Sequence, residues 1–292
     1  MRYQLENESV LLSVDSKGAE LKSLIGKENG QEYLWCGDEK YWNRTSPVLF
    51  PIVGRLIDDR YTYEGKTYEM HQHGFARDRE FTLIHQSDCE LVMRLQSDDA
   101  SKAVYPFDFA LEIGYRLSEK SVTVSWKVIN TGEKEMYFSI GGHPGFVCPL
   151  NQEEKQENYS VRIGAGEDSV ASTLLTGGYV SDEMEEYALG EGGILPLADG
   201  LFDKDALILE DHQAQEAGLV TPDGREYITL KFDAPLFGIW SPPKKHAPFV
   251  CIEPWYGRSD RVGFDGSLCD REWGNHLDTG EVFEASYRIL IS

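Results

Sequence analysis

Phe109-Ala110-Leu111-Glu112-Ile113-Gly114-Tyr115 is the clearest structural signal in the sequence. Large apolar side chains alternate here with small or charged ones, which is the period of a β-strand with one buried face. A turn at Leu117–Lys120 leads into Val122–Val128, which alternates in the same way. Asn130-Thr131-Gly132 then turns the chain into Met136–Ile140. These segments predict an antiparallel β-meander.

Short β-strands are expected on both sides of this meander, and turn signals such as Glu64-Gly65 and Pro222-Asp223-Gly224 separate several of them. Helical signal is limited to short pieces such as Ser181–Leu189, where Ser181 is a possible N-cap. The further strands that we expect are Val10–Val14, Glu20–Leu24, Tyr33–Cys36, Tyr61–Tyr63, Lys66–Tyr68, Phe81–Ile84, Leu91–Leu95, Ala206–Leu209, Tyr227–Phe232, Phe237–Trp240, Phe249–Ile252 and Glu284–Ile291.

The arrangement of these elements predicts an all-β protein. Amphipathic helices of useful length do not alternate with the strands, which argues against a βαβ fold. Many short strands with regular turns are typical of an antiparallel β-sandwich or barrel. The sequence has no convincing internal repeat or linker, so we expect residues 1–292 to form a single domain.

Composition and charge narrow the function classes. The chain has 292 residues and a formal net charge of −22, which argues against nucleic acid as a partner because phosphate contacts need clustered Lys and Arg. Residues 151–200 hold eleven acidic residues against two basic ones, and this excess predicts a solvated, loop-rich face. No apolar run approaches the roughly 20 residues that cross a bilayer. The N-terminal residues are polar and the five cysteines form no C-x-x-C pair, so we expect a cytoplasmic protein with free thiols.

The stretch Phe138–Phe146 places one histidine, His143, among glycines and a proline at the end of the predicted meander. Gly141 and Gly142 carry no side chains, so a ligand could approach the backbone there. Pro144 biases His143 toward extended geometry. Taken alone, the stretch is more typical of a tight turn with a hydrogen-bonded structural histidine than of a ligand site.

Two further stretches carry a charged group beside apolar sequence. Arg55 closes the apolar run Ser46–Leu56, either facing a ligand or meeting Asp58 or Asp59 in an ion pair. Glu253 follows an apolar strand, where desolvation raises a carboxyl pKa toward the values of a general base. The structural alternative for Glu253 is an ion pair with an arginine such as Arg258. Two aromatic residues close to Glu253, Trp255 and Tyr256, could stack on the apolar face of a sugar.

The stretch His71–Phe81 contains His71 and His73, whose side chains point the same way if the segment is a strand. One interpretation is a cupin-like metal site, although Glu80 follows the second histidine by more residues than that signature has. In the other interpretation, one histidine and Arg77 donate hydrogen bonds to a polar ligand. A weaker candidate is Phe202–Leu207, which brings two aspartates to the start of a strand.

Four motifs in this order, SPVLFPIVGRL, HGFARDREF, GGHPGF and IEPWYGRSD, resemble the aldose 1-epimerase (galactose mutarotase-like) family. The nearest likeness is to its bacterial LacX-like branch. The resemblance implies a large antiparallel β-sandwich, the galactose mutarotase-like supersandwich, with a sugar groove on one sheet. It also implies cofactor-free interconversion of α and β anomers, with no metal in the site.

Residue by residue, the resemblance implies that His143 is the general acid and Glu253 the general base. The substrate-binding residues that it implies are Arg55, His73, Arg77, Asp205 and Trp255, with Asp203 as the alternative to Asp205. We further expect neighbouring carboxylates to raise the pKa of His143 and keep it protonated. Galactose mutarotases proper have Asn before the arginine and an Asn-His-Ser-Tyr type context for the histidine, and this chain departs from both.

The leading hypothesis is therefore an aldose 1-epimerase acting on a hexose or hexose phosphate. A non-catalytic carbohydrate-binding or sugar-sensing protein on the same scaffold is the first alternative, and a cupin-like metal-dependent enzyme is the second. The expected partner is a small-molecule sugar, with neither nucleic acid nor membrane, and the expected assembly is a monomer or homodimer. Four arginines, Arg55, Arg60, Arg77 and Arg79, are candidates for a phosphate site.

Overall fold

The computed structural model describes residues 1–151 and 153–292. Strands account for 51% of the chain and helices for 6%, which confirms the all-β prediction. Within these residues the helices are α1 (Asp99–Val104) and four 3₁₀ turns, η1 (Ile57–Asp59), η2 (Ala76–Asp78), η3 (Gln156–Asn158) and η4 (Leu268–Asp270). None of the helices in the described ranges is long and apolar enough to cross a membrane.

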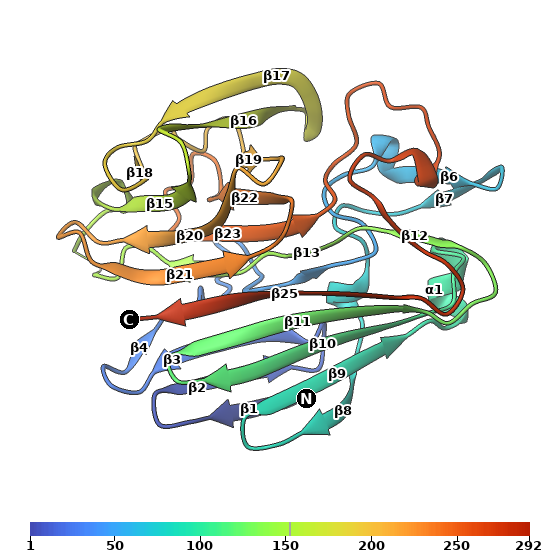
Figure 1. Ribbon diagram of the computed structural model, residues 1–292, viewed down its shortest axis with the longest axis horizontal. Coiled ribbons are helices and arrows are strands. Elements are labelled where there is room, and N and C mark those ends of the chain that lie inside the picture. The colour runs from blue at the N-terminus through green and yellow to red at the C-terminus, as the bar shows by residue number, and fades with distance from the viewer. Residues whose placement is uncertain (152) are drawn as a thin grey trace.

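A nine-stranded antiparallel sheet runs through the whole molecule (Figure 1). Its central strands β10 and β11 form the predicted hairpin, in which Ile113 lies opposite Trp126. In spatial order its strands are β18 (Ile194–Pro196), β15 (Ser160–Ala165), β20 (Ala214–Val220), β21 (Glu226–Phe232), β25 (Val282–Ile291), β11 (Ser121–Asn130), β10 (Phe109–Ser118), β9 (Glu90–Gln96) and β8 (Thr82–Gln86).

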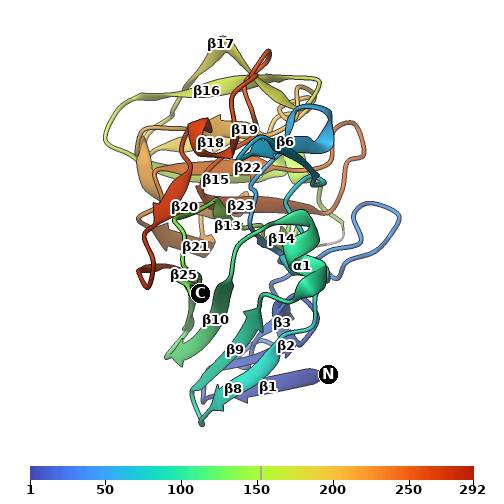
Figure 2. The ribbon, with the colours of Figure 1, turned by 90° about the vertical axis from the view of Figure 1, so that its right-hand side faces the viewer.

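Two other large sheets pack against this one, and Figure 2 shows the N-terminal one beside β8, β9 and β10. That four-stranded sheet has the order β1 (Arg2–Glu6), β2 (Val10–Asp15), β3 (Glu20–Gly26) and β4 (Gln31–Glu32). The eight-stranded sheet has the order β17 (Tyr179–Ala188), β16 (Ser169–Thr176), β19 (Leu207–Leu209), β22 (Leu236–Trp240), β23 (Phe249–Tyr256), β13 (Ile140–Gly142) and β5 (Val48–Leu49), with β14 (Gly145–Val147) also on β23. Two further sheets have two strands each: one is the hairpin of β6 (Arg60–Tyr63) and β7 (Lys66–Glu69), and the other pairs β12 (Met136–Phe138) with the distant β24 (Asn275–Leu277).

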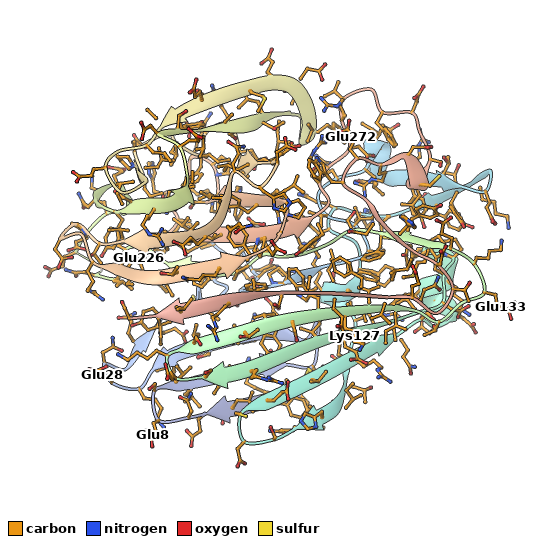
Figure 3. All side chains as sticks on the ribbon, viewed as in Figure 1. Glu8, Glu28, Lys127, Glu133, Glu226 and Glu272 are labelled. Atoms are coloured by element: carbon orange, nitrogen blue, oxygen red, sulfur yellow. The ribbon has the colours of Figure 1, made fainter. Side chains whose placement is uncertain are left out.

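One continuous hydrophobic core joins these sheets. It includes Leu12 from the four-stranded sheet, Leu111 from the nine-stranded sheet and Ile252 from the eight-stranded sheet, none of which is exposed to solvent. Charged residues such as Glu8, Glu28 and Glu133 project from the periphery instead (Figure 3). The three sheets therefore form a large antiparallel β-sandwich, as the sequence predicted.

The eight-stranded sheet has a second face that carries the candidate functional residues. Along β23, Val250 and Ile252 point into the main core, whereas Cys251, Glu253 and Trp255 point to the opposite side. This alternation follows from the two-residue period of a strand. A nearly unbroken apolar sequence therefore presents a carboxylate on the outer face of the sheet.

Four expectations about the strands were wrong or incomplete. The third strand of the meander does not pair with β11, because the C-terminal strand β25 occupies that edge; it is divided into β12 and β13, and β13 lies in the other sheet. Ser181–Leu189 is not helical, because it lies largely in β17, which pairs with β16. Tyr33–Cys36 makes only an isolated bridge at Leu34. The acidic segment 151–200 contains β15 to β18 instead of being mainly loop.

Candidate active site

His143 lies directly opposite Glu253 in the eight-stranded sheet. Gly141 in β13 pairs with Trp255, and Gly145 in β14 pairs with Cys251, so the same antiparallel register places residue 143 opposite residue 253. The ladder is interrupted at His143-Pro144, because proline has no N–H to donate. The interruption leaves the histidine side chain at the break between two short strands while its backbone N–H donates to the Pro47 carbonyl at 3.1 Å.

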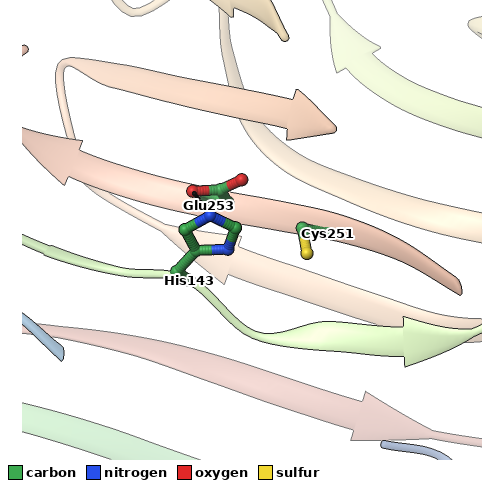
Figure 4. Close-up of side chains that lie close together, drawn as sticks. All are labelled: His143, Cys251 and Glu253. Atoms are coloured by element: carbon green, nitrogen blue, oxygen red, sulfur yellow. Dashed lines mark ion pairs between the residues drawn. The ribbon is translucent and has the colours of Figure 1, made fainter. Parts of the chain in front are cut away.

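The two side chains are in contact and buried (Figure 4). His143 Nε2 is 3.3 Å from Glu253 Oε2, and the two residues are 7% and 1% exposed. Two tryptophans hold the imidazole in place. Trp42 stacks on it with ring centroids 4.6 Å apart, and Trp240 meets it edge-on at 5.4 Å. These contacts fix the orientation of the ring in an environment with little water.

Burial favours the uncharged form of each partner. It lowers the pKa of His143 to about 3, with the Arg77 guanidinium as a second cause. It also raises the pKa of Glu253 well above its usual range, and the Asp205 carboxylate adds to this rise. The nearby Trp255 indole N–H lowers the pKa of Glu253 by a smaller amount, although it does not form a hydrogen bond of ordinary geometry with the carboxyl group. The expectation that carboxylates would raise the pKa of His143 was therefore wrong, because desolvation and the Arg77 charge lower this pKa instead.

His73 is fixed beside His143, with ring centroids 5.7 Å apart. The backbone N–H of Gly54 donates to His73 Nδ1 at 3.1 Å, and the backbone N–H of His73 donates to the Gly54 carbonyl at 2.9 Å. Burial lowers the pKa of His73 well below its usual value, with His143 as the next cause. Because Nδ1 of this neutral ring accepts a hydrogen bond, its proton is on Nε2, which lies 3.2 Å from the Gln72 side-chain amide nitrogen.

The two groove arginines are held by backbone carbonyls. Arg55 Nη1 donates to the Gly177 carbonyl at 3.2 Å, and its guanidinium lies over the Tyr179 ring at 5.6 Å. Arg77 Nη2 donates to the Gln72 carbonyl at 2.7 Å, and burial lowers the pKa of Arg77 to about 10. In both cases Nε is buried without a hydrogen-bond partner among the described residues. Each guanidinium is therefore oriented but keeps a free donor.

Two glycines make room for Trp255. A Cβ on Gly141 would lie 2.6 Å from Trp255 Cδ1, and one on Gly238 would lie 2.5 Å from Trp255 Cη2. The space beside Gly142 is likewise filled, by Trp126 and Tyr287. The expectation that Gly141 and Gly142 open the backbone to a ligand was wrong, because aromatic side chains of the protein fill the space that a side chain at either position would occupy.

The structure distinguishes the two aspartates. Asp205, at a backbone φ of 84°, lies in the wall of the groove that holds Glu253, whereas Asp203 lies in the wall of a different cavity. Asp205 Oδ1 accepts a hydrogen bond from the Ala206 N–H at 2.9 Å. The choice of Asp205 over Asp203 agrees with this placement.

All seven candidate residues line one groove of about 650 Å³ on the outer face of the sheet. Several of their polar atoms are buried without a partner in the part of the chain that the structure describes, and such atoms are uncommon in folded proteins unless a ligand or water satisfies them. They are Arg55 Nε, Arg77 Nε, His143 Nδ1, Glu253 Oε2 and Trp255 Nε1. The groove is thus lined with free donors and acceptors suited to a polyhydroxylated ligand.

The other charged candidates lie elsewhere. Arg60 forms an ion pair with Asp58, and Arg79 forms one with Asp98; neither arginine lines the groove. His71 is exposed and its nearest carboxylate, Asp59, is 3.8 Å away. Residues 71 and 73 are therefore not gathered at one site, which removes the geometric basis of the cupin-like interpretation.

The structural alternatives for Arg55 and Glu253 are not observed either. Arg258, the expected partner of Glu253, instead forms ion pairs with Glu210 at 3.1 Å and with Glu272. The Arg55 guanidinium contacts Gly177 and Tyr179 of the β16–β17 hairpin and forms no ion pair with Asp58 or Asp59. Both side chains thus remain available to a ligand.

Three residues at the site were not found from the sequence. Trp42 and Trp240 hold the His143 ring, and Cys251 lies beside it. Trp42 lies in an irregular segment with no periodic signal. The other two were recognisable only as apolar strand residues, although Cys251 shares a strand face with Glu253 because the two are two positions apart.

The chain is similar to known proteins over almost its whole length. The sequence profile of the aldose 1-epimerase family matches residues 1–284. Protein LacX of Lactococcus lactis subsp. lactis is 32% identical over 299 residues, which cover 100% of this chain and 99% of that protein. A galactose mutarotase related enzyme from Lactobacillus acidophilus has a TM-score of 0.94 at 33% identity, covering 100% of this chain and 97% of that one. A galactose mutarotase-like protein from Lactobacillus casei has a TM-score of 0.93 at 30% identity, covering both chains fully.

Proposed function

Because the chain belongs to the aldose 1-epimerase family, we propose that it interconverts the α and β anomers of a hexose or hexose phosphate by acid–base catalysis. Family membership and the mutarotase-like fold support a sugar epimerase or a related activity. The more specific reaction rests on the geometry of the groove. The observation that carries it is the buried contact of His143 Nε2 with Glu253 Oε2 at 3.3 Å.

In the proposed reaction, Glu253 removes the proton of the C1 hydroxyl while His143 donates a proton to the ring oxygen. The C1–O5 bond breaks and C1 becomes a carbonyl, so the sugar is open-chained. Rotation about the C1–C2 bond presents the other face of the carbonyl. As the ring closes, His143 takes the proton back from the C5 hydroxyl and Glu253 returns its proton to the carbonyl oxygen. No electrons are gained or lost, and the enzyme regains its starting protonation.

The pair needs one transferable proton for this cycle. In the empty groove, burial lowers the pKa of His143 and raises that of Glu253, so this proton rests on the carboxyl group. Transfer across the 3.3 Å contact gives the imidazolium and carboxylate forms that start the reaction. The net charge of the pair is the same before and after this transfer, so it adds no net charge to the buried site.

The surrounding residues support binding of a sugar. His73 donates through Nε2, the Trp255 indole N–H has no partner within the described chain, and Asp205 accepts hydrogen bonds at the same groove. Arg55 and Arg77 bring positive charge to a protein whose net charge is −22. They suit a phosphorylated sugar as well as a neutral one, because a guanidinium binds phosphate and hydroxyl groups alike.

The experiment that tests this function follows anomer equilibration by polarimetry for freshly dissolved α-glucose and α-galactose and, by NMR, for their 6-phosphates. We expect the purified protein to accelerate at least one sugar in proportion to enzyme concentration. Saturable sugar binding with no acceleration of any of them would support the carbohydrate-binding alternative instead.

A further inference from the structure

Cys251 is a buried thiol that the proposed acid–base chemistry does not use. It precedes Glu253 by two positions on β23, so both side chains leave the same face of the sheet. The thiol is fully buried in a small cluster with Trp35 and Phe249, against which Trp42 and Trp240 pack. Figure 4 shows it beside the imidazole of His143.

His143, Cys251 and Glu253 offer one nitrogen, one sulfur and one oxygen ligand atom, all within 4.8 Å of one another. Zinc binds imidazole and carboxylate at about 2.0–2.2 Å and thiolate at about 2.3 Å, so neighbouring ligand atoms around a tetrahedral ion lie roughly 3.3–3.8 Å apart. The His143–Glu253 contact, at 3.3 Å, already has this spacing. A side-chain adjustment on the order of 1 Å would bring the thiol into the same coordination sphere.

One ligand atom of this set, Glu253 Oε2, is buried with no hydrogen bond from the described residues. His143 and Glu253 both line the groove, which leaves a route to the solvent and an open position for a fourth ligand. A catalytic or inhibitory zinc ion with three protein ligands has the same arrangement, with water in the open position.

We propose that His143, Cys251 and Glu253 form a binding site for a thiophilic divalent cation of the Zn²⁺ class. A cation bound there occupies both groups of the proposed acid–base pair, so the sugar and the cation exclude each other. The site is therefore inhibitory and makes the groove sensitive to free zinc.

The charges balance for such a complex. The empty site holds a neutral thiol and a His143–Glu253 pair that shares one transferable proton, so it carries no net charge. One Zn²⁺ with a thiolate, a carboxylate and a neutral imidazole also sums to zero. Binding therefore releases two protons to the solvent and leaves no uncompensated charge in the buried site, where such a charge would be costly.

The test measures binding and needs no turnover, so its failure is distinguishable from failure of the proposed function. Untagged protein is stripped with EDTA, dialysed and titrated with Zn²⁺ by calorimetry. Cys251→Ala removes the thiol ligand, and Cys148→Ala is the matched control because Cys148 is also buried but lies outside the cluster. We expect one zinc per chain for the wild type and the control, and at least about tenfold weaker binding for Cys251→Ala.

Two further variants show whether the zinc binds at this site or at a surface cluster. His143→Ala keeps the thiol and is expected to lose affinity in the same way, while thermal unfolding checks that both variants are folded. His246→Ala removes a second cluster, formed by Glu157, Asp199 and His246 on the surface, and is expected to leave the tight site intact. Co²⁺ should give a thiolate charge-transfer absorption in the wild type that Cys251→Ala lacks. Zinc affinity that survives Cys251→Ala but is lost in His246→Ala would overturn the proposal.

Discussion

His143 and Glu253 occupy opposite positions of one antiparallel register, although no ladder hydrogen bond joins them. Pairing of Gly141 with Trp255 and of Gly145 with Cys251 sets this relationship, and the resulting side-chain contact is 3.3 Å. The geometry of the pair therefore belongs to the sheet and not to a flexible loop. Such a support is well suited to holding an acid and a base at a fixed separation.

The pH dependence of kcat/KM should be bell-shaped, because activity requires the pair to hold one transferable proton. On the acid side, activity falls when a second proton binds to His143, whose lowered pKa moves this limb below the ordinary histidine value of 6.5. On the alkaline side, activity falls when Glu253 loses its proton, and its raised pKa moves this limb upward. A profile recorded with EDTA that loses activity on acidification near pH 6.5 would contradict this account.

Replacing the base should stabilise the protein at alkaline pH. The folded-state pKa of Glu253 is raised above 4.5, so the unfolded chain ionises first and folding stability falls as pH rises above that value. Glu253→Gln removes this penalty, which is about 1.4 kcal/mol for each unit of pKa difference. We expect the gain in unfolding free energy to be larger at pH 8 than at pH 4.5, as measured by urea denaturation. An equal effect at both pH values would show that burial does not destabilise the ionised carboxyl group.

Trp255 should be sensitive to any atom added behind it. Gly238→Ala would place a Cβ 2.5 Å from Trp255 Cη2, so the indole must shift toward the groove. We expect a loss of about 1–3 kcal/mol in stability, as for other overpacked sites, together with a higher KM. Gly166→Ala is the control, because a Cβ there has no atom within 4 Å. A wild-type KM in Gly238→Ala would show that Trp255 does not take part in sugar binding.

The two groove arginines should distinguish phosphorylated from neutral sugars. Arg77→Gln removes a guanidinium whose buried Nε makes no hydrogen bond inside the described ranges and lies 3.9 Å from Asp78 Oδ2. If the substrate is a sugar phosphate, its KM should rise about 10-fold or more while that of the neutral sugar changes little. Arg79→Gln is the matched control, because Arg79 forms an ion pair with Asp98 outside the groove. If Arg77→Gln raises the KM of both sugars equally, Arg77 binds a hydroxyl group of the sugar and not a phosphate.

Much of the fold follows from local sequence patterns. The β10–β11 hairpin and the β6–β7 hairpin were predictable because alternation and turn residues agree in those segments. The pairing of β11 with β25 was not predictable, because β25 comes from the far end of the chain and only the tertiary structure brings it beside β11. At β17, the N-cap signal of Ser181 led to a wrong prediction, because pairing with β16 outweighs a local preference.

In the candidate site, too, some features were predictable from the sequence and others depend on the tertiary structure. Charged or aromatic residues next to apolar runs, such as Arg55 and Glu253, were recognisable from the sequence, and the order of four motifs indicated that they belong together. The pKa of His143 was not predictable, because it depends on burial beneath Trp42 and Trp240. The place of Cys251 beside His143 likewise depends on how β13 and β14 pair with β23.

The measurement that tests the acid–base assignment most directly is the anomerisation rate of the best sugar with wild type, His143→Ala and Glu253→Gln at equal concentrations. Circular dichroism checks that each variant is folded. Each group should contribute about 10²–10⁴-fold, so we expect both variants to lose most of the enzymatic rate while sugar binding persists. Wild-type turnover in either folded variant would contradict the assignment of the His143–Glu253 pair.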